Sequence, residues 1–412
     1  MDRLLRMRFS TVLAALGFLS LIVNFAAQWR TPHAVDFSSE AARVSFAILH
    51  GRGFSDPYLT GPSGPTAQMA PLYPFFHAAI CSVFGVDAAG WFAIVAITSL
   101  AWAFECAYAY RIASAFGQAI PGLAAAMLGA MLPLQGRFFK WEGVFTGAAL
   151  AFCTWEMTQL LAGHGGRWRG LRLGMGLAAA VLLCPSSVLI WPAWGLFCLY
   201  KMGFRRALGI FTPVFLLALI PIALWTVRNY REFGKIFFIR DDMGLVLVSS
   251  YSDCATALLS ENLASGCYLH EHPSANVAML DKLRVAGEFD FFASESRRTR
   301  SWIAAHPVRA AELTVEHAIY FWFPLDRIDK VTLLYGIIFS ALTILSFGSL
   351  FWKSDAVPIL LLALIPFSLT YYTAQFEQRY RYPVLWISGL LASVGVKLIF
   401  ERLRRQPARM SF

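Results

Sequence analysis

Charged residues are scarce in this sequence. Asp, Glu, Lys and Arg together make up 15% of the 412 residues, whereas hydrophobic residues make up 58%. A soluble domain has about 25% charged residues and about 45–50% apolar ones. The deficit in charge therefore excludes an ordinary soluble domain. Apolar runs of about twenty residues, the length that a helix needs to cross a bilayer, recur along the chain, so the sequence predicts an integral helical membrane protein.

Several catalytic signatures are also missing. The chain has no Gly-rich phosphate loop followed by Lys, no Ser-hydrolase elbow and no cysteine pair with zinc-binding spacing. Five of the seven cysteines lie in apolar segments, where we expect inert buried thiols. The other two, Cys254 and Cys267, lie in the one long polar stretch. Because that stretch is predicted to face an oxidising compartment, we expect these two cysteines to form a disulfide.

The excess of basic residues is informative about topology. The net charge is +10, but Lys and Arg cluster in short loops between apolar runs, at 167–172, 201–206 and 402–409. This distribution follows the positive-inside rule and argues against binding to nucleic acid. Residues 1–8 are also basic, and the apolar run after them lacks a clear cleavage site, which predicts a retained first span. We therefore expect an inner (plasma) membrane protein with both termini in the cytoplasm.

About ten membrane spans are predicted, which makes the fold class an all-α polytopic membrane protein. The predicted spans are residues 9–29, 90–111, 118–134, 143–162, 172–186, 188–201, 206–226, 331–352, 356–373 and 382–400. Residues 72–85 are apolar but too short to cross. Counting them as a span would move every basic loop outside, so we expect them to lie in the outer interface.

The chain divides into three parts. An N-terminal transmembrane core, 1–226, includes a first outer loop at 30–89. An outer, periplasmic insert of mixed structure, 227–330, contains expected helices around residues 276–286, 288–305 and 307–322. C-terminal transmembrane helices and a basic cytoplasmic tail, 331–412, complete the chain.

The predicted outer segments carry motifs in a distinctive order. The first outer loop has an acid at Asp36, a helix-like run that ends at Gly51, and then GRGFSDP, PTA and PLYPFF. Later segments read WTVRNYREFGKIFFIRDDMG at 225–244, HPVRAAELTVEHAIYFW at 306–322 and QRYRYPV at 378–384. In this order the motifs resemble the GT-C superfamily of membrane glycosyltransferases, which includes protein O-mannosyltransferase-like and aminoarabinose-transferase-like enzymes and an uncharacterised bacterial branch.

The resemblance implies a GT-C-like fold and an enzyme that moves a sugar from a polyprenyl-phosphate donor to a glycan, lipid or protein acceptor on the outer face. An essential acid of the family's first outer loop matches Asp36, and a second acid matches Glu142. Asp36 would then be the base that takes the acceptor's proton, with Glu142 as its helper. The same two acids would hold a divalent metal if the enzyme uses one, although Phe37 stands where many members have a second acid.

Four arginines lie at the outer ends of predicted spans or just beyond them, against the positive-inside bias. They are Arg228, Arg240, Arg379 and Arg381. Arginine binds phosphate in a bidentate geometry with a fixed charge, so these side chains are candidate contacts for the donor phosphate. The alternative is that they anchor the chain at the membrane interface or pair with neighbouring acids, which are Asp241, Asp242 and Glu377.

Three further features bear on the choice between a functional and a structural interpretation. Asp36 could equally be the N-cap of a surface helix that ends near Gly51. Tyr73 is a candidate for framing the lipid groove. The cluster His270-Glu271-His272 lacks the helical two-His spacing of a metal site, so we expect it to be a solvated loop.

The main alternative function is a multi-pass transporter or lipid flippase that uses two acids inside predicted spans, Glu105 and Glu156. A charged group there costs about 2.5–3.5 kcal/mol and usually faces the bundle or a cavity. The structural interpretation is that both acids are packing residues buried in the bundle. Transporters often contain internal repeats, and this sequence has none that we detect. A non-catalytic scaffold with the same fold is the third alternative.

Topology can be tested by labelling single engineered cysteines with a membrane-impermeant reagent. We expect labelling in intact cells at positions 63, 276 and 375, and labelling only after permeabilisation at positions 169, 206 and 405, because the basic loops stay in the cytoplasm. If residues 63 and 169 were labelled from the same side, the interfacial assignment of residues 72–85 would be wrong.

Overall fold

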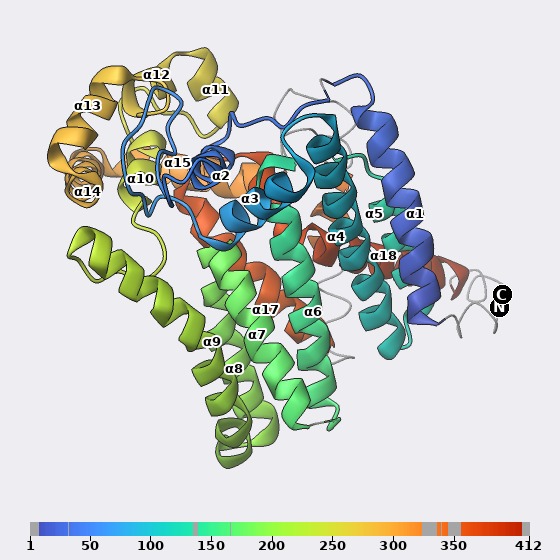
Figure 1. The fold of residues 1–412 in the computed structure, drawn as a ribbon. Coiled ribbons are helices and arrows are strands. Elements are labelled where there is room, and N and C mark those ends of the chain that lie inside the picture. Colours follow the sequence, from blue (N-terminus) through green and yellow to red (C-terminus); the bar gives the residue numbers. More distant parts are fainter. Residues whose placement is uncertain are drawn as a thin grey trace.

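The computed structural model describes residues 8–31, 33–134, 139–164, 166–323, 336–338, 340–344 and 356–405. Over these residues the chain forms helices and loops, with two isolated β-bridges and no β-strand. A helical bundle carries an outer layer at one end (Figure 1). The bundle consists of α1 (Phe9–Gln28), α4 (Ala88–Ala115), α5 (Ala119–Ala130), α6 (Gly143–Leu161), α7 (Arg167–Leu183), α8 (Ile190–Met202), α9 (Phe204–Phe233), α17 (Ala356–Leu369) and α18 (Tyr382–Arg405).

The outer layer is built from two segments that are far apart in the sequence. The first outer loop contributes α2 (Glu40–Leu49) and α3 (Leu72–Phe84). The insert contributes α10 (Met243–Ser250), α11 (Leu259–Ala264), α12 (Cys267–Glu271), α13 (Val277–Ala286), α14 (Glu288–Ala305) and α15 (Pro307–Trp322). Figure 1 shows the insert helices grouped beside α2, at the end of the bundle where α3 also lies.

Four stretches within the described residues are long and apolar enough to cross a membrane, namely α1, α4, α9 and Gln378–Glu401, which includes most of α18. Shorter apolar helices accompany them, so the chain is a multi-pass membrane protein. Nine of the predicted spans coincide with helices, and most of the tenth, 331–352, lies outside the described residues. Helix α9 continues to Phe233, beyond residue 226 where the insert was expected to begin.

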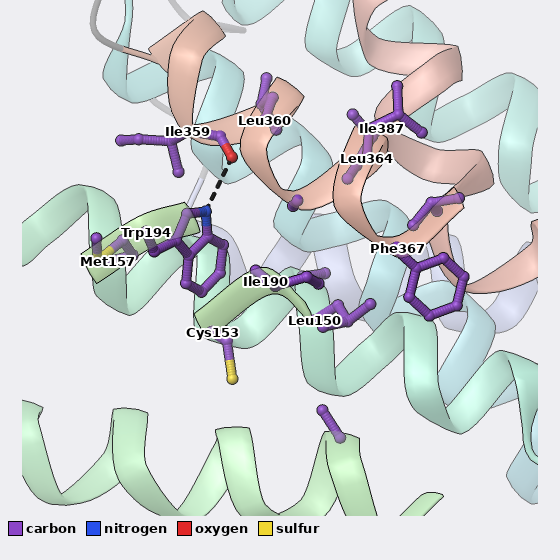
Figure 2. Close-up of a cluster of buried hydrophobic side chains, with 14 of the residues drawn as sticks. Leu150, Cys153, Met157, Ile190, Trp194, Ile359, Leu360, Leu364, Phe367 and Ile387 are labelled. Carbon is purple, nitrogen blue, oxygen red and sulfur yellow. Dashed lines mark hydrogen bonds between the residues drawn. The ribbon is translucent and has the colours of Figure 1, made fainter. Parts of the chain in front are cut away.

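The core of the bundle lies where α6, α8 and α17 meet (Figure 2). Trp194 is buried there, and its indole N–H donates to the backbone carbonyl of Ile359 at 3.1 Å, which satisfies its single polar atom in an apolar interior. Gly176 brings α7 close to α6, since a Cβ at this position would lie 2.7 Å from the Sγ of Cys153. Small residues allow this close approach between membrane helices.

The ends of α2 follow from local sequence. Ser39 is the N-cap, and its hydroxyl accepts a hydrogen bond from the N–H of Ala42 at 3.2 Å. Asp36 is therefore not the N-cap, and its carboxylate accepts from the N–H of Ser38 at 2.7 Å instead. The helix ends before Gly51, whose φ of 70° is strained for residues with a Cβ. The cap places Glu40 at the first position of the helix.

The insert is more helical than its composition indicates. Helices α13, α14 and α15 form where the sequence places them. The remainder, expected to be of mixed structure, contains short helices and loops over the described residues, with one bridge from Leu258 to Phe376. Asn262 joins this part to the segment before Arg379, because its amide donates to the carbonyl of Thr256 at 3.0 Å and to the side-chain oxygen of Gln375 at 2.5 Å.

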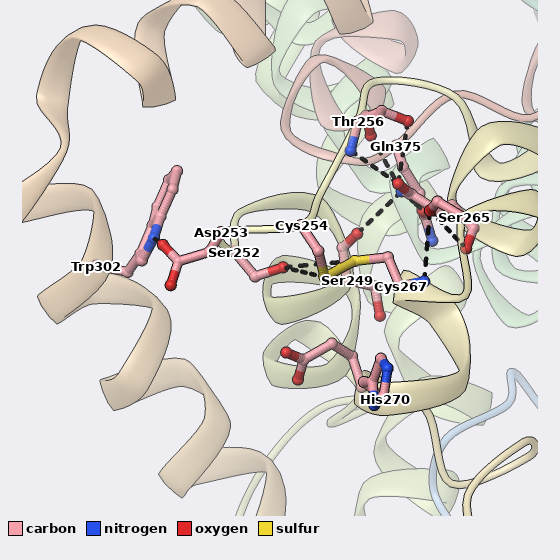
Figure 3. Close-up of a disulfide and its surroundings, with 12 residues drawn as sticks. Ser249, Ser252, Asp253, Cys254, Thr256, Ser265, Cys267, His270, Trp302 and Gln375 are labelled. Carbon is pink, nitrogen blue, oxygen red and sulfur yellow. Dashed lines mark hydrogen bonds between the residues drawn. A yellow bond between two sulfur atoms is a disulfide. The ribbon is translucent and has the colours of Figure 1, made fainter.

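A disulfide joins Cys254 and Cys267, the pair singled out in the sequence (Figure 3). It fixes the start of α12 to the loop that follows α10. The same loop is held to α14, where the indole N–H of Trp302 donates to Asp253 at 2.6 Å. The disulfide therefore determines the position of α12 and of the residues directly after it.

Replacing both half-cystines with serine should destabilise the outer layer. A closed loop of about 15 residues contributes about 3 kcal/mol in the chain-entropy model. We expect a lower Tm for the C254S/C267S variant, measured by thermal unfolding of the purified protein in detergent. Reductant should lower the Tm of the wild type and leave the variant unchanged. Equal Tm values for the oxidised wild type and the variant would contradict this contribution.

Candidate active site

The first turn of α2 places the carboxylate of Glu40 at the junction of the first outer loop and the insert. Three groups lie against its Oε1: Nε2 of Gln68 at 3.1 Å, Oγ of Ser274 at 3.3 Å and Nε2 of His272 at 3.3 Å. The side chain of Glu40 is only 18% exposed. A buried carboxylate needs such donors, so the contact of Glu40 with the insert helps to hold the two segments together.

His272 serves Glu40 as a neutral donor. Burial and the nearby Arg379 guanidinium lower the pKa of His272 to about 3, so the imidazole is uncharged at neutral pH. The N–H of Ser274 donates to Nδ1 at 3.1 Å, so the ring proton resides on Nε2, the nitrogen that faces Glu40. The expectation of a solvated loop is thus wrong for His272, because folding stacks its ring on Tyr268 with the ring centroids 4.4 Å apart.

Glu142 approaches the same region from the short loop before α6. Tyr73 donates its hydroxyl proton to the carbonyl of Phe139 at 3.0 Å, and Ser39 donates to the carbonyl of Lys140 at 3.1 Å. These bonds attach the loop to α3 and to the start of α2. Tyr73 is buried and therefore positions this loop rather than facing a groove.

Two arginines lie beside these acids. The guanidinium of Arg379 lies over the ring of Trp141, 3.4 Å from its centroid, and its Nε is 2.5 Å from a carboxylate oxygen of Glu377. Arg240 forms an ion pair with Asp242. Guanidinium groups have five N–H donors, so each arginine keeps further donors after one ion pair.

The charges of these groups influence one another. Burial raises the pKa of Glu40 and Glu142, and the charges of Arg379 and Arg240 oppose that rise at both carboxyls. Burial also raises the pKa of Asp242, again against the charge of Arg240. We name Glu40, Glu142, Arg240 and Arg379 the outer centre. Four buried or half-buried carboxyls, with Asp242 and Glu377 included, thus face two guanidinium groups.

Asp36 lies at the edge of this centre. It forms an ion pair with Lys140, and 48% of its side chain is exposed. Burial tends to raise its pKa, but hydrogen bonds from Lys140 and Ser38 outweigh that effect and the net pKa is lowered. Asp36 lies four residues before Glu40, in the non-helical segment that leads into α2, and Lys140 balances its charge.

The four candidate arginines separate into two groups. Arg240 and Arg379 belong to the outer centre. Arg228 donates to the carbonyls of Thr66 at 2.8 Å and Phe54 at 3.1 Å, so it holds the first outer loop. Arg381 is buried, and it donates to the carbonyl of Trp322 at 2.9 Å.

Two buried acids behind the outer centre form a second cluster. Glu288 accepts a hydrogen bond from the N–H of Ala67 at 2.5 Å. Both carboxyl oxygens of Asp241 are buried and lack a hydrogen-bond partner among the described residues. Burial raises the pKa of Asp241, and the neighbouring charge of Glu288 raises it further. The pKa of Glu288 is also raised by burial, despite its bond to Ala67.

The intramembrane acids have different environments. Glu156 pairs with Arg169 at 3.0 Å and with Arg172 at 3.4 Å. Both carboxyl oxygens of Glu105 are buried without a hydrogen-bond partner in the described part of the chain. Glu105 lies against Gly147, where a Cβ would be 2.3 Å from one of its oxygens.

No group of three or more His, Cys, Asp or Glu side chains with the geometry of a metal site occurs in the described ranges. The residues proposed as metal ligands, Asp36 and Glu142, have other partners: Lys140 for Asp36, and the field of Arg379 for Glu142. These surroundings do not fit a divalent cation held by that pair alone.

Sequence reasoning passed over two residues of the site. Glu40 looked like an ordinary first-turn acid, and the available signal was its position directly after the cap Ser39. His272 was hidden because its partner is more than two hundred positions away along the chain. No sequence pattern connects such a pair.

Comparisons with known proteins inform the fold alone. No protein-family model matches the sequence, and no curated protein matches it. Among solved structures, the chain is similar to the oligosaccharyltransferase of Archaeoglobus fulgidus, crystallised with zinc and sulfate, with a TM-score of 0.58 and 14% sequence identity. The match covers 95% of this chain and 49% of that one, so this chain spans about half the length of the archaeal enzyme. The fold of this chain therefore resembles that of about half of the archaeal enzyme.

The Asp241 and Glu288 pair should make stability depend on pH. The pKa of each group is higher in the folded than in the unfolded protein, so the native state favours the protonated forms. Their stabilising contribution is complete at low pH and is lost as the pH rises above about 4 through the folded-state values. We expect the Tm of the wild type to fall more steeply between about pH 5 and pH 9 than that of D241N.

The matched control is D281N, which changes an exposed acid on α13 that pairs with Arg284. Its Tm should have the same pH dependence as the wild type. Parallel curves for D241N and the wild type would show that the buried pair does not titrate in this range.

Proposed function

We propose that the protein is a membrane glycosyltransferase that moves a sugar from a polyprenyl-phosphate donor to an acceptor on the outer face of the membrane. The observation that supports it best is the outer centre, where carboxyls from two outer loops and arginines from two other segments meet at the end of a GT-C-like bundle. Donor and acceptor would be recognised in the outer layer, where loop and insert meet.

The reaction needs a base and a stabilised leaving group. An acceptor hydroxyl oxygen attacks the anomeric carbon, the bond from that carbon to the phosphate oxygen breaks, and polyprenyl phosphate leaves with the electron pair. The hydroxyl proton passes to a carboxylate. Positive charge beside the phosphate stabilises the developing negative charge.

We propose Glu40 as that base, with Glu142 as a second acid of the centre. The sequence pointed to Asp36, in the same segment. A base works best when its pKa is close to the working pH. Burial raises the pKa of Glu40, whereas the ion pair with Lys140 helps to lower that of Asp36. The two assignments make opposite predictions for two substitutions.

Arg379 and Arg240 are the proposed contacts for the donor phosphate. Both act on Glu40 and Glu142, so a phosphate bound to them would lie beside the proposed base. The ring of Trp141 covers one face of the Arg379 guanidinium, and Glu377 pairs with its Nε, so the phosphate would bind the remaining N–H donors on its edge. The sequence-based roles of Arg228 and Arg381 are better described as positioning, since both bind backbone carbonyls.

The transporter alternative depends on Glu105 and Glu156. Two arginines neutralise Glu156. Glu105 is the observation that favours this alternative, because its buried oxygens lack a described hydrogen-bond partner. A test of the function must therefore include both acids.

Purified E40Q and D36N should be compared in an assay that follows labelled polyprenyl-phosphate sugars into a membrane extract. Gln and Asn keep the shape of each side chain and remove the charge that a base needs. We expect E40Q to lose at least about a hundredfold in rate, the usual contribution of a general base. D36N should stay within about threefold of the wild type, since its carboxylate lies at the edge of the centre.

The controls are E105Q and E156Q, with the Tm of every variant measured alongside. A transferase that uses the outer centre keeps substantial activity in both. The reverse pattern, with tolerance at position 40 and loss of function at positions 105 and 156, would support transport and contradict the proposal. If D36N alone lost transferase activity, Asp36 rather than Glu40 would be assigned as the base.

A further inference from the structure

A cavity of about 420 Å³ lies between α14 and the segment that follows α9. Small-molecule sites commonly have volumes of about 300–1,000 Å³. The residues that define its character are Phe237, Asp241, Phe289, Phe292, Arg297 and Arg300. The cavity therefore combines aromatic walls, one carboxyl group and two guanidinium groups.

The aromatic wall is preformed. The rings of Phe237 and Phe289 are stacked, with their centroids 5.6 Å apart and an interplanar angle of 29°. The ammonium group of Lys235 lies 5.6 Å from the centre of the Phe289 ring. An ordered, flat aromatic surface can pack against the C–H face of a sugar ring without losing side-chain entropy on binding.

The two arginines are available for an anion. Arg297 and Arg300 are three residues apart on α14, so they project from the same face of the helix. Both are exposed, and neither forms an ion pair with a described residue. By contrast, Arg298 between them pairs with Glu271 and Glu295. Guanidinium groups bind carboxylate or phosphate with two parallel hydrogen bonds.

Asp241 supplies the remaining polar group. Its two oxygens are buried without a partner, which is costly unless a ligand provides hydrogen bonds. Its raised pKa keeps the carboxyl protonated at neutral pH. A protonated carboxyl also does not repel an anionic ligand.

The cavity shares a wall with the outer centre. Arg240 and Asp242 flank Asp241 in the chain and interact with the acids of the centre, Arg240 with Glu142 and Asp242 with Glu40. Asp241, between them, lines the cavity. A molecule bound in the cavity would thus lie next to the proposed reaction centre.

We propose that this cavity binds a sugar that carries a carboxylate or phosphate group, as part of the acceptor of the transfer reaction. The sugar ring packs on Phe237 and Phe289, and the anionic group binds Arg297 and Arg300. The role as acceptor rests on the proposed glycosyltransferase function. Binding itself does not depend on turnover.

The test is saturation-transfer NMR on the purified protein, with glucose, glucuronic acid and glucose 6-phosphate as probes. Either anionic sugar should bind at least about tenfold more tightly than glucose. The R297A/R300A variant should bind the anionic sugars and glucose equally, to within about twofold. The control R309A, which changes an exposed arginine on α15, should keep the wild-type preference. Equal affinities for all three sugars in the wild type would overturn the proposal.

Two further arms identify the source of the anion and separate the two proposals. In the first arm, binding to nanodiscs of phosphatidylglycerol is compared with binding to neutral nanodiscs. If anionic lipid binds through Arg297 and Arg300 and none of the sugars binds, the cavity is a lipid site and the proposal fails. E40Q should bind the anionic sugars like the wild type, because Glu40 lies outside the cavity. Sugar binding without transferase activity in the wild type would contradict the proposed function and leave the cavity's ligand class standing.

Discussion

The contact of the Glu40 carboxylate with the insert is the interaction on which the outer face depends. One oxygen of Glu40 faces Gln68 of its own loop and Ser274 and His272 of the insert. An unpaired carboxylate at this depth would cost several kcal/mol, so loop and insert are stable there only together. The disulfide at Cys267 and the Asn262 network then determine where α12 and the Arg379 segment lie. Together these contacts join the first outer loop, the insert and the segment of Arg379 into one surface.

The same surface holds more acidic side chains than basic ones. Four carboxyls face two arginines in the outer centre, and Asp241 and Glu288 lie buried behind it. Folding alone would favour replacing such groups with apolar or amide side chains. Structural cost concentrated at one place is typical of functional sites, where perturbed pKa values serve proton transfer or ligand binding. The cost here falls on the outer layer, where base, phosphate contacts and acceptor cavity are proposed to meet.

Features that depend on interactions between residues close together in the sequence could be predicted, whereas features that depend on contacts between distant residues could not. Apolar runs and capping residues act over a few positions, so nine spans, α13–α15 and the cysteine pair could be located from the sequence. Arg240 and Arg379 could be proposed because arginines at outer span ends are unusual. The sequence offers no reason to prefer Glu40 over Asp36. Only in the folded chain is Glu40 largely buried and Asp36 paired with Lys140. Likewise, the cavity beside Asp241 depends on packing between α14 and the segment that follows α9.

The distribution of polar groups through the bundle favours surface chemistry over transport. A proton or ion pathway needs acids at successive depths, each within reach of the next. Glu156 is neutralised by Arg169 and Arg172, and Glu105 is separated from it and lies against Gly147. Between α6, α8 and α17 the described interior is filled by side chains such as Leu150, Met157 and Phe367. The outer layer, in contrast, brings acids, arginines and a cavity together within one packed unit. The apolar bundle beneath holds the parts of that surface in register.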